Sequence, residues 1–363
     1  MPLLSASERV SWMGDNSRWR RTFRLPTSVD SGRIAPVTFS SPLAPPPCHQ
    51  ERPLVSPGPI SQAAPARSYP PDAPPAGSET PFFFQVHGSP VYSVLHAAAP
   101  GKPLAPVVVD VHGLGVEQIT LYRQEVLVAR AAAAHGFPVL RYHARGHGDS
   151  AGASADVTLD SMVEDARAAA DEAKRRTGRD RVVWLGVRMG ALVAARAGGP
   201  GSGRDDAAGF LLWEPVERPA EFFRQQLRTL LYSRVAGGQK PDATVDQLLE
   251  RIASEGSLDV FGYTLHRASI DSFAAASLGE ALVGTRAPVL VAQVQERARL
   301  AAPHAELVAA LRAAEGGVPV PRTGPNVATA MIHEEPGYQF MSNPAWQSDA
   351  LTRATLEWLD ALA

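Results

Sequence analysis

The sequence predicts an α/β fold in which a mostly parallel sheet is flanked by helices. Residues 107–111 and 182–185 are nearly continuous apolar runs, which is typical of strands buried on both faces of a sheet. A stretch with helical periodicity follows each run after a short link. Strands that alternate with helices across short connections form parallel sheets, so these observations favour one large α/β domain.

The composition excludes several classes of protein. Hydrophobic residues make up 45% of the 363 residues and charged residues 20%, as in a soluble globular protein. The net charge of -2 predicts no nucleic-acid partner, and the absence of a run of about eighteen apolar residues predicts no membrane span. Cys48 is the single cysteine, which excludes a disulfide framework, and we predict neither a metal nor a cofactor. No secretion signal is evident, so the expected location is cytoplasmic.

Proline dominates the first part of the chain. Of the 32 prolines, 15 precede Gly77, and no sustained apolar periodicity accompanies them. Because proline fixes φ and removes amide donors, we predict that residues 1–79 form a disordered extension. A linker or targeting segment and an over-long gene start are the alternatives. Order is expected from Phe82 onward.

The remaining elements follow in order along the chain. Residues 82–86 and 91–95 predict a hairpin around a turn-rich spacer. Further strands are predicted at 107–111, 139–142, 182–185, 210–213, 288–292 and near 330–332, and helices at 119–134, 159–176, 189–197 and 348–362.

The alternation of strands and helices is interrupted after the sixth predicted strand. Residues 216–282 carry apolar positions at helical spacing, which predicts a helical insertion that covers the sheet. The predicted division is therefore a first core part at 80–215, a helical cap at 216–282 and a second core part at 283–363.

The turn between residues 182–185 and 189–197 carries the most specific motif. Residues 186–190 read Gly-Val-Arg-Met-Gly, which matches the nucleophile elbow Gly-x-Ser-x-Gly of the α/β-hydrolase fold except at its centre. The sequence therefore predicts that fold, with a cap after strand 6. Arg188 stands where the fold keeps its nucleophilic serine, and a guanidinium that stays protonated cannot attack an acyl carbon.

Two loops next to the elbow complete the predicted site. His112-Gly113-Leu114 follows a strand, and in this fold such a turn presents the amide of the residue after glycine to an oxyanion. We expect the amides of Leu114 and Met189 to form that oxyanion hole. The loop that contains Ser150 is predicted to be structural, with the Ser150 hydroxyl bound to loop backbone rather than acting as a nucleophile.

The remaining members of a catalytic triad have only tentative candidates. Glu296 follows the strand at 288–292, and Glu214 follows the strand at 210–213. His333 is the one histidine near the end of the last predicted strand. A lone histidine at such a place is more often a packed or surface residue than a catalytic base.

Three segments carry a resemblance to a known family: Trp184-Leu185-Gly186-Val187-Arg188-Met189-Gly190, Leu211-Leu212-Trp213-Glu214-Pro215-Val216 with Phe222-Phe223, and Ser257-Leu258-Asp259-Val260-Phe261-Gly262-Tyr263. On these segments the chain, from about Phe82 onward, resembles the exosortase A system-associated hydrolases, second group. The resemblance implies a soluble protein encoded beside exopolysaccharide machinery, in which arginine at the elbow is a family trait.

Three functions remain open at this point. The first is a pseudo-hydrolase that binds a small anionic or acyl ligand through Arg188, His112 and Gly113, since a guanidinium at a helix N-terminus attracts anions. The second is an active ester, thioester or amide hydrolase in which His333 or a carboxylate activates water. The third is an interaction protein whose partner contacts the cap or the proline-rich segment.

Overall fold

The computed structural model describes residues 77–238, 240, 243–297, 299–314, 326–339 and 346–362. All but the last three residues of the predicted N-terminal extension therefore lie outside the described residues. The first strand begins at Glu79, three residues before the expected start of order at Phe82.

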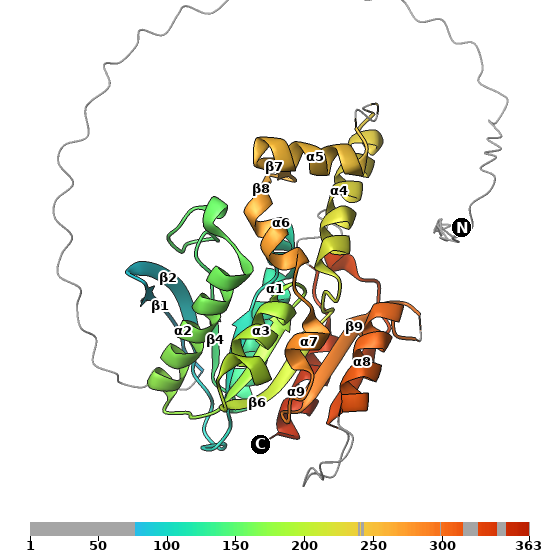
Figure 1. The fold of residues 1–363 in the computed structure, drawn as a ribbon. Coiled ribbons are helices and arrows are strands. Elements are labelled where there is room, and N and C mark those ends of the chain that lie inside the picture. The colour runs from blue at the N-terminus through green and yellow to red at the C-terminus, as the bar shows by residue number, and fades with distance from the viewer. Residues whose placement is uncertain are drawn as a thin grey trace, which may run out of the picture. The chain divides into compact units, whose positions relative to one another are not determined.

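A mostly parallel eight-stranded sheet forms the centre of the fold (Figure 1). Its order is β1-β2-β4-β3-β5-β6-β9-β10; β1 and β2 are antiparallel to their neighbours and the other pairs are parallel. This architecture confirms the predicted α/β-hydrolase fold. The strands are β1 (Glu79–Val86), β2 (Ser89–His96), β3 (Val107–Val111), β4 (Val139–Tyr142), β5 (Val182–Val187), β6 (Ala207–Trp213), β9 (Val289–Val294) and β10 (Val327–Ile332).

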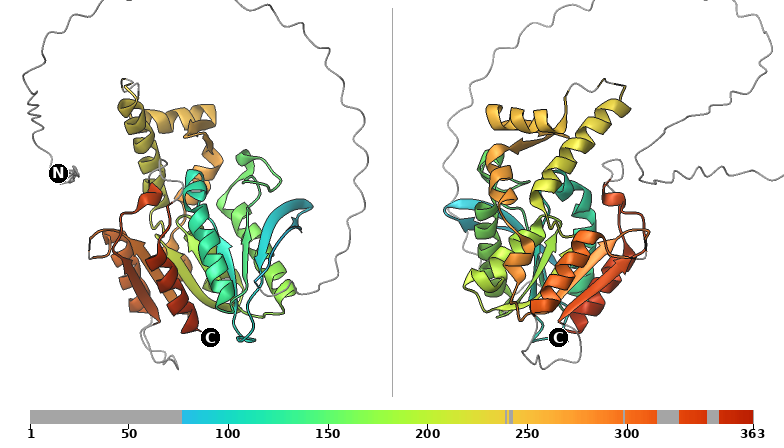
Figure 2. Two further views of the ribbon diagram at one scale, coloured as in Figure 1. Left: turned by 180° about the vertical axis from the view of Figure 1, so that it is seen from behind. Right: turned by 45° about the vertical axis from the view of Figure 1, so that its right-hand side comes forward.

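Helices cover both faces of the sheet. α1 (Val116–Ala134) and α9 (Asp349–Asp360) lie on one face, which is turned to the reader in the left view of Figure 2. The other face carries α2 (Leu159–Thr177), α3 (Gly190–Gly198), α7 (Leu278–Leu282) and α8 (Ala302–Ala314). Three single turns are also present: η1 (Ser154–Asp156), η2 (Pro200–Ser202) and η3 (Gly337–Gln339).

The two helical layers explain why the central strands are apolar throughout. Val107, Val109 and Val111 of β3 pack toward α2 and α3, whereas Val108 packs toward α1.

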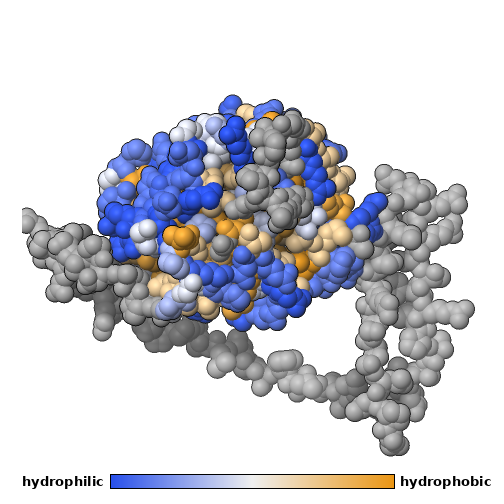
Figure 3. Space-filling view, turned by 90° about the horizontal axis from the view of Figure 1, so that it is seen from below, coloured by the Kyte–Doolittle hydropathy of each residue, from blue (hydrophilic) through white to orange (hydrophobic). Residues whose placement is uncertain are grey.

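The end of the sheet away from the insertion, seen from below in Figure 3, exposes hydrophilic and hydrophobic residues side by side.

Most of residues 216–282 extends beyond the carboxyl ends of the strands (Figure 1). This cap segment contains α4 (Pro219–Ala236), α5 (Val245–Glu255), β7 (Ser257–Val260), β8 (Tyr263–His266) and α6 (Arg267–Ala274), with α7 at its end. The prediction that it is entirely helical is wrong for the hairpin of β7 and β8. A two-residue turn joins these strands, with φ of 58° at Phe261 and 80° at Gly262, and such turns match the twist of paired strands. The boundaries of the cap as a separate domain stay a prediction.

Helix α1 begins at Val116, three residues before the predicted start at Ile119. The earlier start places Glu117 in the first turn of the helix, directly after the Gly113–Gly115 loop. A carboxylate is favourable there because the N-terminus of a helix carries partial positive charge.

A cluster of buried ionisable residues lies between α1 and the sheet. Asp110, Glu125, Arg141 and His96 are each at most 7% exposed. Arg141 Nε lies 3.7 Å from Asp110 Oδ2, whereas Glu125 Oε1 and both ring nitrogens of His96 have no hydrogen-bond partner among the described residues. Burial raises the pKa of Asp110 to about 7. Burial and the neighbouring Asp110 charge raise the pKa of Glu125 well above its ordinary value.

This cluster predicts a loss of stability with rising pH. The folded chain keeps a proton on Glu125 that the unfolded chain releases above about 4.5, so the folded state loses stability as pH rises from there through the raised pKa. Glu125→Gln cannot ionise, and we expect it to lose less unfolding free energy than wild type as the pH rises above about 4.5. Urea unfolding at several pH values measures this, with the exposed Glu250→Gln as control. Parallel curves for wild type and Glu125→Gln would contradict it.

Candidate active site at the strand elbow

Arg188 stands on a sharp turn between β5 and α3. Its φ of 54° is in the left-handed region, which is strained for a residue other than glycine. Neighbouring glycines make the turn possible, because a Cβ on Gly190 would lie 2.1 Å from the carbonyl oxygen of Val111 and one on Gly186 would lie 2.5 Å from the Cα of Ala191. The structure thus has the strand–turn–helix geometry of a nucleophile elbow, with arginine at its tip.

The guanidinium of Arg188 is held by groups from several elements. Nε and Nη2 lie 3.0 and 2.9 Å from Oε1 of Glu117 on α1, and Nη1 donates to the backbone carbonyl of Glu214 at 2.8 Å. The rings of Phe222 in the cap segment and Tyr338 in η3 have centroids 6.0 and 5.7 Å from the guanidinium carbon. The Arg188 side chain is 18% exposed and that of Glu117 9%. Arg188 is therefore a fixed, largely buried part of the site.

The charges in this cluster compensate one another. Burial by itself lowers the pKa of Arg188, but the charge and hydrogen bond of Glu117 and the charge of Glu214 outweigh that effect, so the pKa lies above its ordinary value. Burial raises the pKa of Glu117 and of Glu214, and the charge of Arg188 opposes the rise in both. The guanidinium is consequently an ion-pair partner and not an uncompensated cation.

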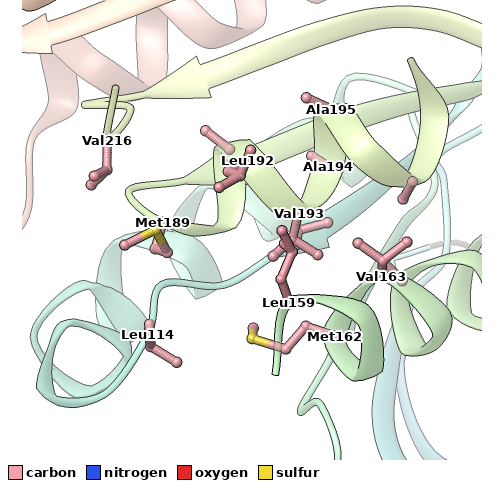
Figure 4. Close-up of a cluster of buried hydrophobic side chains, with 14 of the residues drawn as sticks. Leu114, Leu159, Met162, Val163, Met189, Leu192, Val193, Ala194, Ala195 and Val216 are labelled. Carbon is pink, nitrogen blue, oxygen red and sulfur yellow. The ribbon is translucent and has the colours of Figure 1, made fainter. Parts of the chain in front are cut away.

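The amides of Leu114 and Met189 donate no hydrogen bond to any described part of the chain. Both side chains are buried in the core, and Figure 4 shows them on different segments, with Met189 at the start of the helix that carries Leu192. A Cβ on the intervening Gly113 would lie 3.3 Å from the Cβ of Glu117 and 3.7 Å from that of Arg188. The loop that carries the Leu114 amide thus adjoins the ion pair.

The two ring nitrogens of His112 are both used within the loops. Nδ1 donates to the carbonyl of Gly113 at 2.7 Å, and Nε2 accepts from the amide of Ala144 at 3.0 Å. Burial lowers the pKa of His112 well below its ordinary value, so the ring is neutral. The sequence predicts that His112 and Gly113 bind a ligand. In the structure they shape the loop at residues 112–115, and the ring has no free nitrogen for a ligand.

Of the tentative triad residues, the structure brings only Glu214 to the elbow. Its carboxylate accepts from the amide of Val294, and its own φ is 45°. Glu296 lies beyond the end of β9 and His333 directly follows β10; both are exposed. Neither forms a hydrogen bond with Arg188, Glu117 or Glu214 in the described part of the chain.

Sequence reasoning missed two residues of the cluster. Only one weak indication of Glu117 is present in the sequence: it is an acidic residue three positions after Leu114, shortly before the predicted start of a helix at Ile119. Tyr338 comes from the loop after β10, where a catalytic base was sought, and it is 2% exposed. No pattern in the sequence distinguishes this tyrosine from a surface residue. Ser150, in contrast, is bound as expected: its hydroxyl accepts from the Tyr92 amide at 2.8 Å and donates to the His143 carbonyl at 2.5 Å.

An apolar cavity of about 30 Å³ lies between residues 114–116 and the cap segment. It is lined by Leu114, Gly115, Val116, Phe222, Phe223, Gln226, Val260, Tyr263 and Leu265. A larger hollow of about 490 Å³ lies among α2, α3, η2 and α7. Its lining includes none of Arg188, Glu117, Glu214 and Tyr338. The small cavity thus shares Leu114 with the loop next to the elbow and Phe222 with the surroundings of the Arg188 guanidinium.

The described residues contain neither a candidate metal site nor a candidate membrane span. They contain no group of three or more His, Cys, Asp or Glu side chains placed to hold a metal ion. Across the same part of the chain, every helix is too short or too polar to span a bilayer.

The buried ion pair predicts a large effect of removing one partner. Arg188→Ala leaves the Glu117 carboxylate buried and unpaired, and we expect it to lower the unfolding free energy by about 3–5 kcal/mol. Removing both charges in Arg188→Met with Glu117→Gln should recover most of that loss. Chemical denaturation measures both, with Arg251→Ala, from an exposed helical pair, expected to lose less than about 1 kcal/mol. Equal losses in the single and double variants would show that the pair itself does not stabilise the fold.

Comparisons with known proteins agree with the α/β-hydrolase fold described above. The chain is similar to an esterase of Pyrococcus furiosus, with TM-score 0.52 and 13% identity over 78% of this chain and 91% of that chain. It is also similar to Est1E of Butyrivibrio proteoclasticus, solved with ferulic acid bound, with TM-score 0.51 and 18% identity over 77% and 97% of the two chains. At these identities the likeness shows the fold alone. No curated protein matches the sequence significantly. The family described as serine aminopeptidase, S33, matches residues 102–297, more than half of the chain, and the protein therefore belongs to this family of α/β-hydrolases.

Proposed function

We propose that this protein binds a small acyl ligand on a hydrolase scaffold and performs no serine-based acyl transfer. The observation that carries the proposal is the position of Arg188 at the strained elbow, paired with Glu117 and bonded to the Glu214 carbonyl. Acyl transfer by this fold starts from a hydroxyl at that tip, and a protonated guanidinium has no electron pair to offer.

The charge balance of the site favours a carbonyl group over a free anion as the bound group. A strong anion site needs an uncompensated cation, whereas the Arg188 charge is matched by Glu117 at 2.9 Å. The amides of Leu114 and Met189 remain as donors, and Met189 caps the N-terminus of α3. Two amides beside a helix N-terminus are suited to an acyl oxygen. The apolar cavity next to Leu114 would hold the hydrocarbon part of the ligand.

One observation favours a second candidate, a hydrolase that activates water without serine. Oε2 of Glu117 is buried and has no hydrogen-bond partner among the described residues. A carboxylate whose pKa is raised by burial, next to two free amides, has the chemistry of a general base for water. In this candidate Glu117 activates water, the role predicted from the sequence for His333 or a carboxylate such as Glu214.

The resemblance to the exosortase A system-associated hydrolases supports a narrower proposal. Its motifs at the elbow, at the end of β6 and in the cap hairpin would make arginine at position 188 a shared trait. A link to exopolysaccharide systems follows from it as a proposal. A protein partner bound through the cap or the N-terminal segment is a separate proposal, which does not depend on the resemblance.

The first candidate predicts that restoring serine does not restore activity. Neither wild type nor Arg188→Ser with Glu117→Gln should hydrolyse short p-nitrophenyl esters above the buffer rate, because no histidine ring of the described residues hydrogen-bonds to Arg188 or Glu117. Without the covalent nucleophile and base a serine enzyme loses about a millionfold in rate. Steady-state assays of folded protein, checked by circular dichroism, measure this. Clear turnover by the serine variant would mean that a base reaches the elbow.

The second candidate predicts slow hydrolysis that depends on Glu117. Wild type would turn over short esters or amides, and Glu117→Gln would lose about 10²-fold or more, since general-base catalysis contributes on that scale. His333→Ala, at an exposed position, serves as the matched control and should retain wild-type activity. A rate unaffected by Glu117→Gln removes this candidate.

A further inference from the structure

Glu117 offers a buried hydrogen-bond acceptor that nothing in the described chain uses. The residue is 7% exposed, and both of its contacts with Arg188 go to Oε1. Oε2 has no hydrogen-bond partner among the residues that the structure describes. A buried carboxylate oxygen without a donor is unfavourable, since burying polar groups unpaired costs free energy that a donor recovers. The oxygen therefore points to a ligand that brings an N–H or O–H group.

Two unused donors belong to the segments that contact Glu117 and its partner Arg188. The loop carrying the Leu114 amide approaches Glu117 closely, with 3.3 Å between the place of a Cβ on Gly113 and the Cβ of Glu117. The amide of Met189 follows directly on Arg188, which Glu117 binds. The complementary ligand carries a carbonyl oxygen next to a donor. An ester has the carbonyl but no donor, and a carboxylate would place a second negative charge beside Glu117.

The cavity limits the size of the acyl group. A cavity of about 150 Å³ holds benzene, so each carbon needs roughly 25 Å³. The space of about 30 Å³ beside Leu114 therefore accepts about one carbon. Gln226 is the one amide side chain in its lining, and the rings of Phe222, Phe223 and Tyr263 bound the rest. This space suits the methyl group of an acetyl unit.

We propose that the ligand of this site is a short carboxamide of the acetamide type. Its carbonyl oxygen accepts from the amides of Leu114 and Met189, its N–H donates to Oε2 of Glu117, and its methyl group occupies the cavity bounded by Phe223. The proposal rests on the proposed acyl-binding function and specifies the class of ligand.

Four small probes test the proposal on the full chain by NMR titration of backbone amides. Acetamide should bind about tenfold or more tightly than methyl acetate, because hydrogen bonds to charged groups are worth that factor or more. Butanamide, with two extra carbons, should bind about tenfold more weakly than acetamide, since overfilling a packed cavity has an effect of that size. N-methylacetamide distinguishes the sources: binding equal to acetamide indicates an N-acetyl group on a larger molecule, and weaker binding indicates a primary amide.

A variant tests the size limit independently. Phe223→Ala enlarges the cavity and should reverse the order of acetamide and butanamide, whereas Phe83→Ala, at a half-exposed position on β1, should leave it unchanged. If methyl acetate binds as well as acetamide, or butanamide as well as acetamide in wild type, the carboxamide inference fails while acyl binding stands. If none of the four probes shifts the Leu114 or Met189 amide resonances, the proposed function itself fails.

Discussion

The site depends on one interaction, the ion pair of Arg188 with Glu117. It joins the tip of the β5 turn to the first turn of α1, and the same guanidinium reaches the carbonyl at the end of β6. Each charge is largely buried, so each is stable there only because the other is present. The position that begins covalent chemistry in relatives of this fold is therefore filled by a group that holds three elements together.

The elbow keeps its geometry although its nucleophile is replaced. A positive φ at Arg188 costs about 1–3 kcal/mol, and Gly186 and Gly190 have no room for a side chain. The same turn that aims a serine in a hydrolase also leaves the Met189 amide without a hydrogen-bond acceptor in the described part of the chain. A strained turn with free donors and a paired arginine is consistent with ligand binding, and it explains why the scaffold alone does not reveal the chemistry.

The cap hairpin sets the size of the cavity. Tyr263 on β8 donates to Nε2 of His147 at 2.9 Å, since Nδ1 of that ring faces the Arg145 carbonyl. Burial lowers the pKa of His147 to about 4, so the ring stays a neutral acceptor. The Ser154 hydroxyl of η1 lies 3.0 Å from Nε2 of His266, which ends β8. These contacts tie the hairpin to the core next to Gly115, and so the space above Leu114 is small.

The sequence by itself determined the sheet, its helical layers and the elbow, because apolar strands and tight glycine turns are local patterns whose spacing is visible along the chain. It also placed Arg188, Leu114, Met189 and Glu214 at strand ends that a parallel sheet brings together. Tertiary structure alone decided that Glu117 neutralises Arg188, that Tyr338 and not His333 reaches the cluster, and that residues 257–266 pair as strands. The first two outcomes depend on side chains that meet across elements more than fifty residues apart, and burial, which sets their charge and pairing, exists only in the folded chain. The hairpin is a local pairing of adjacent strands.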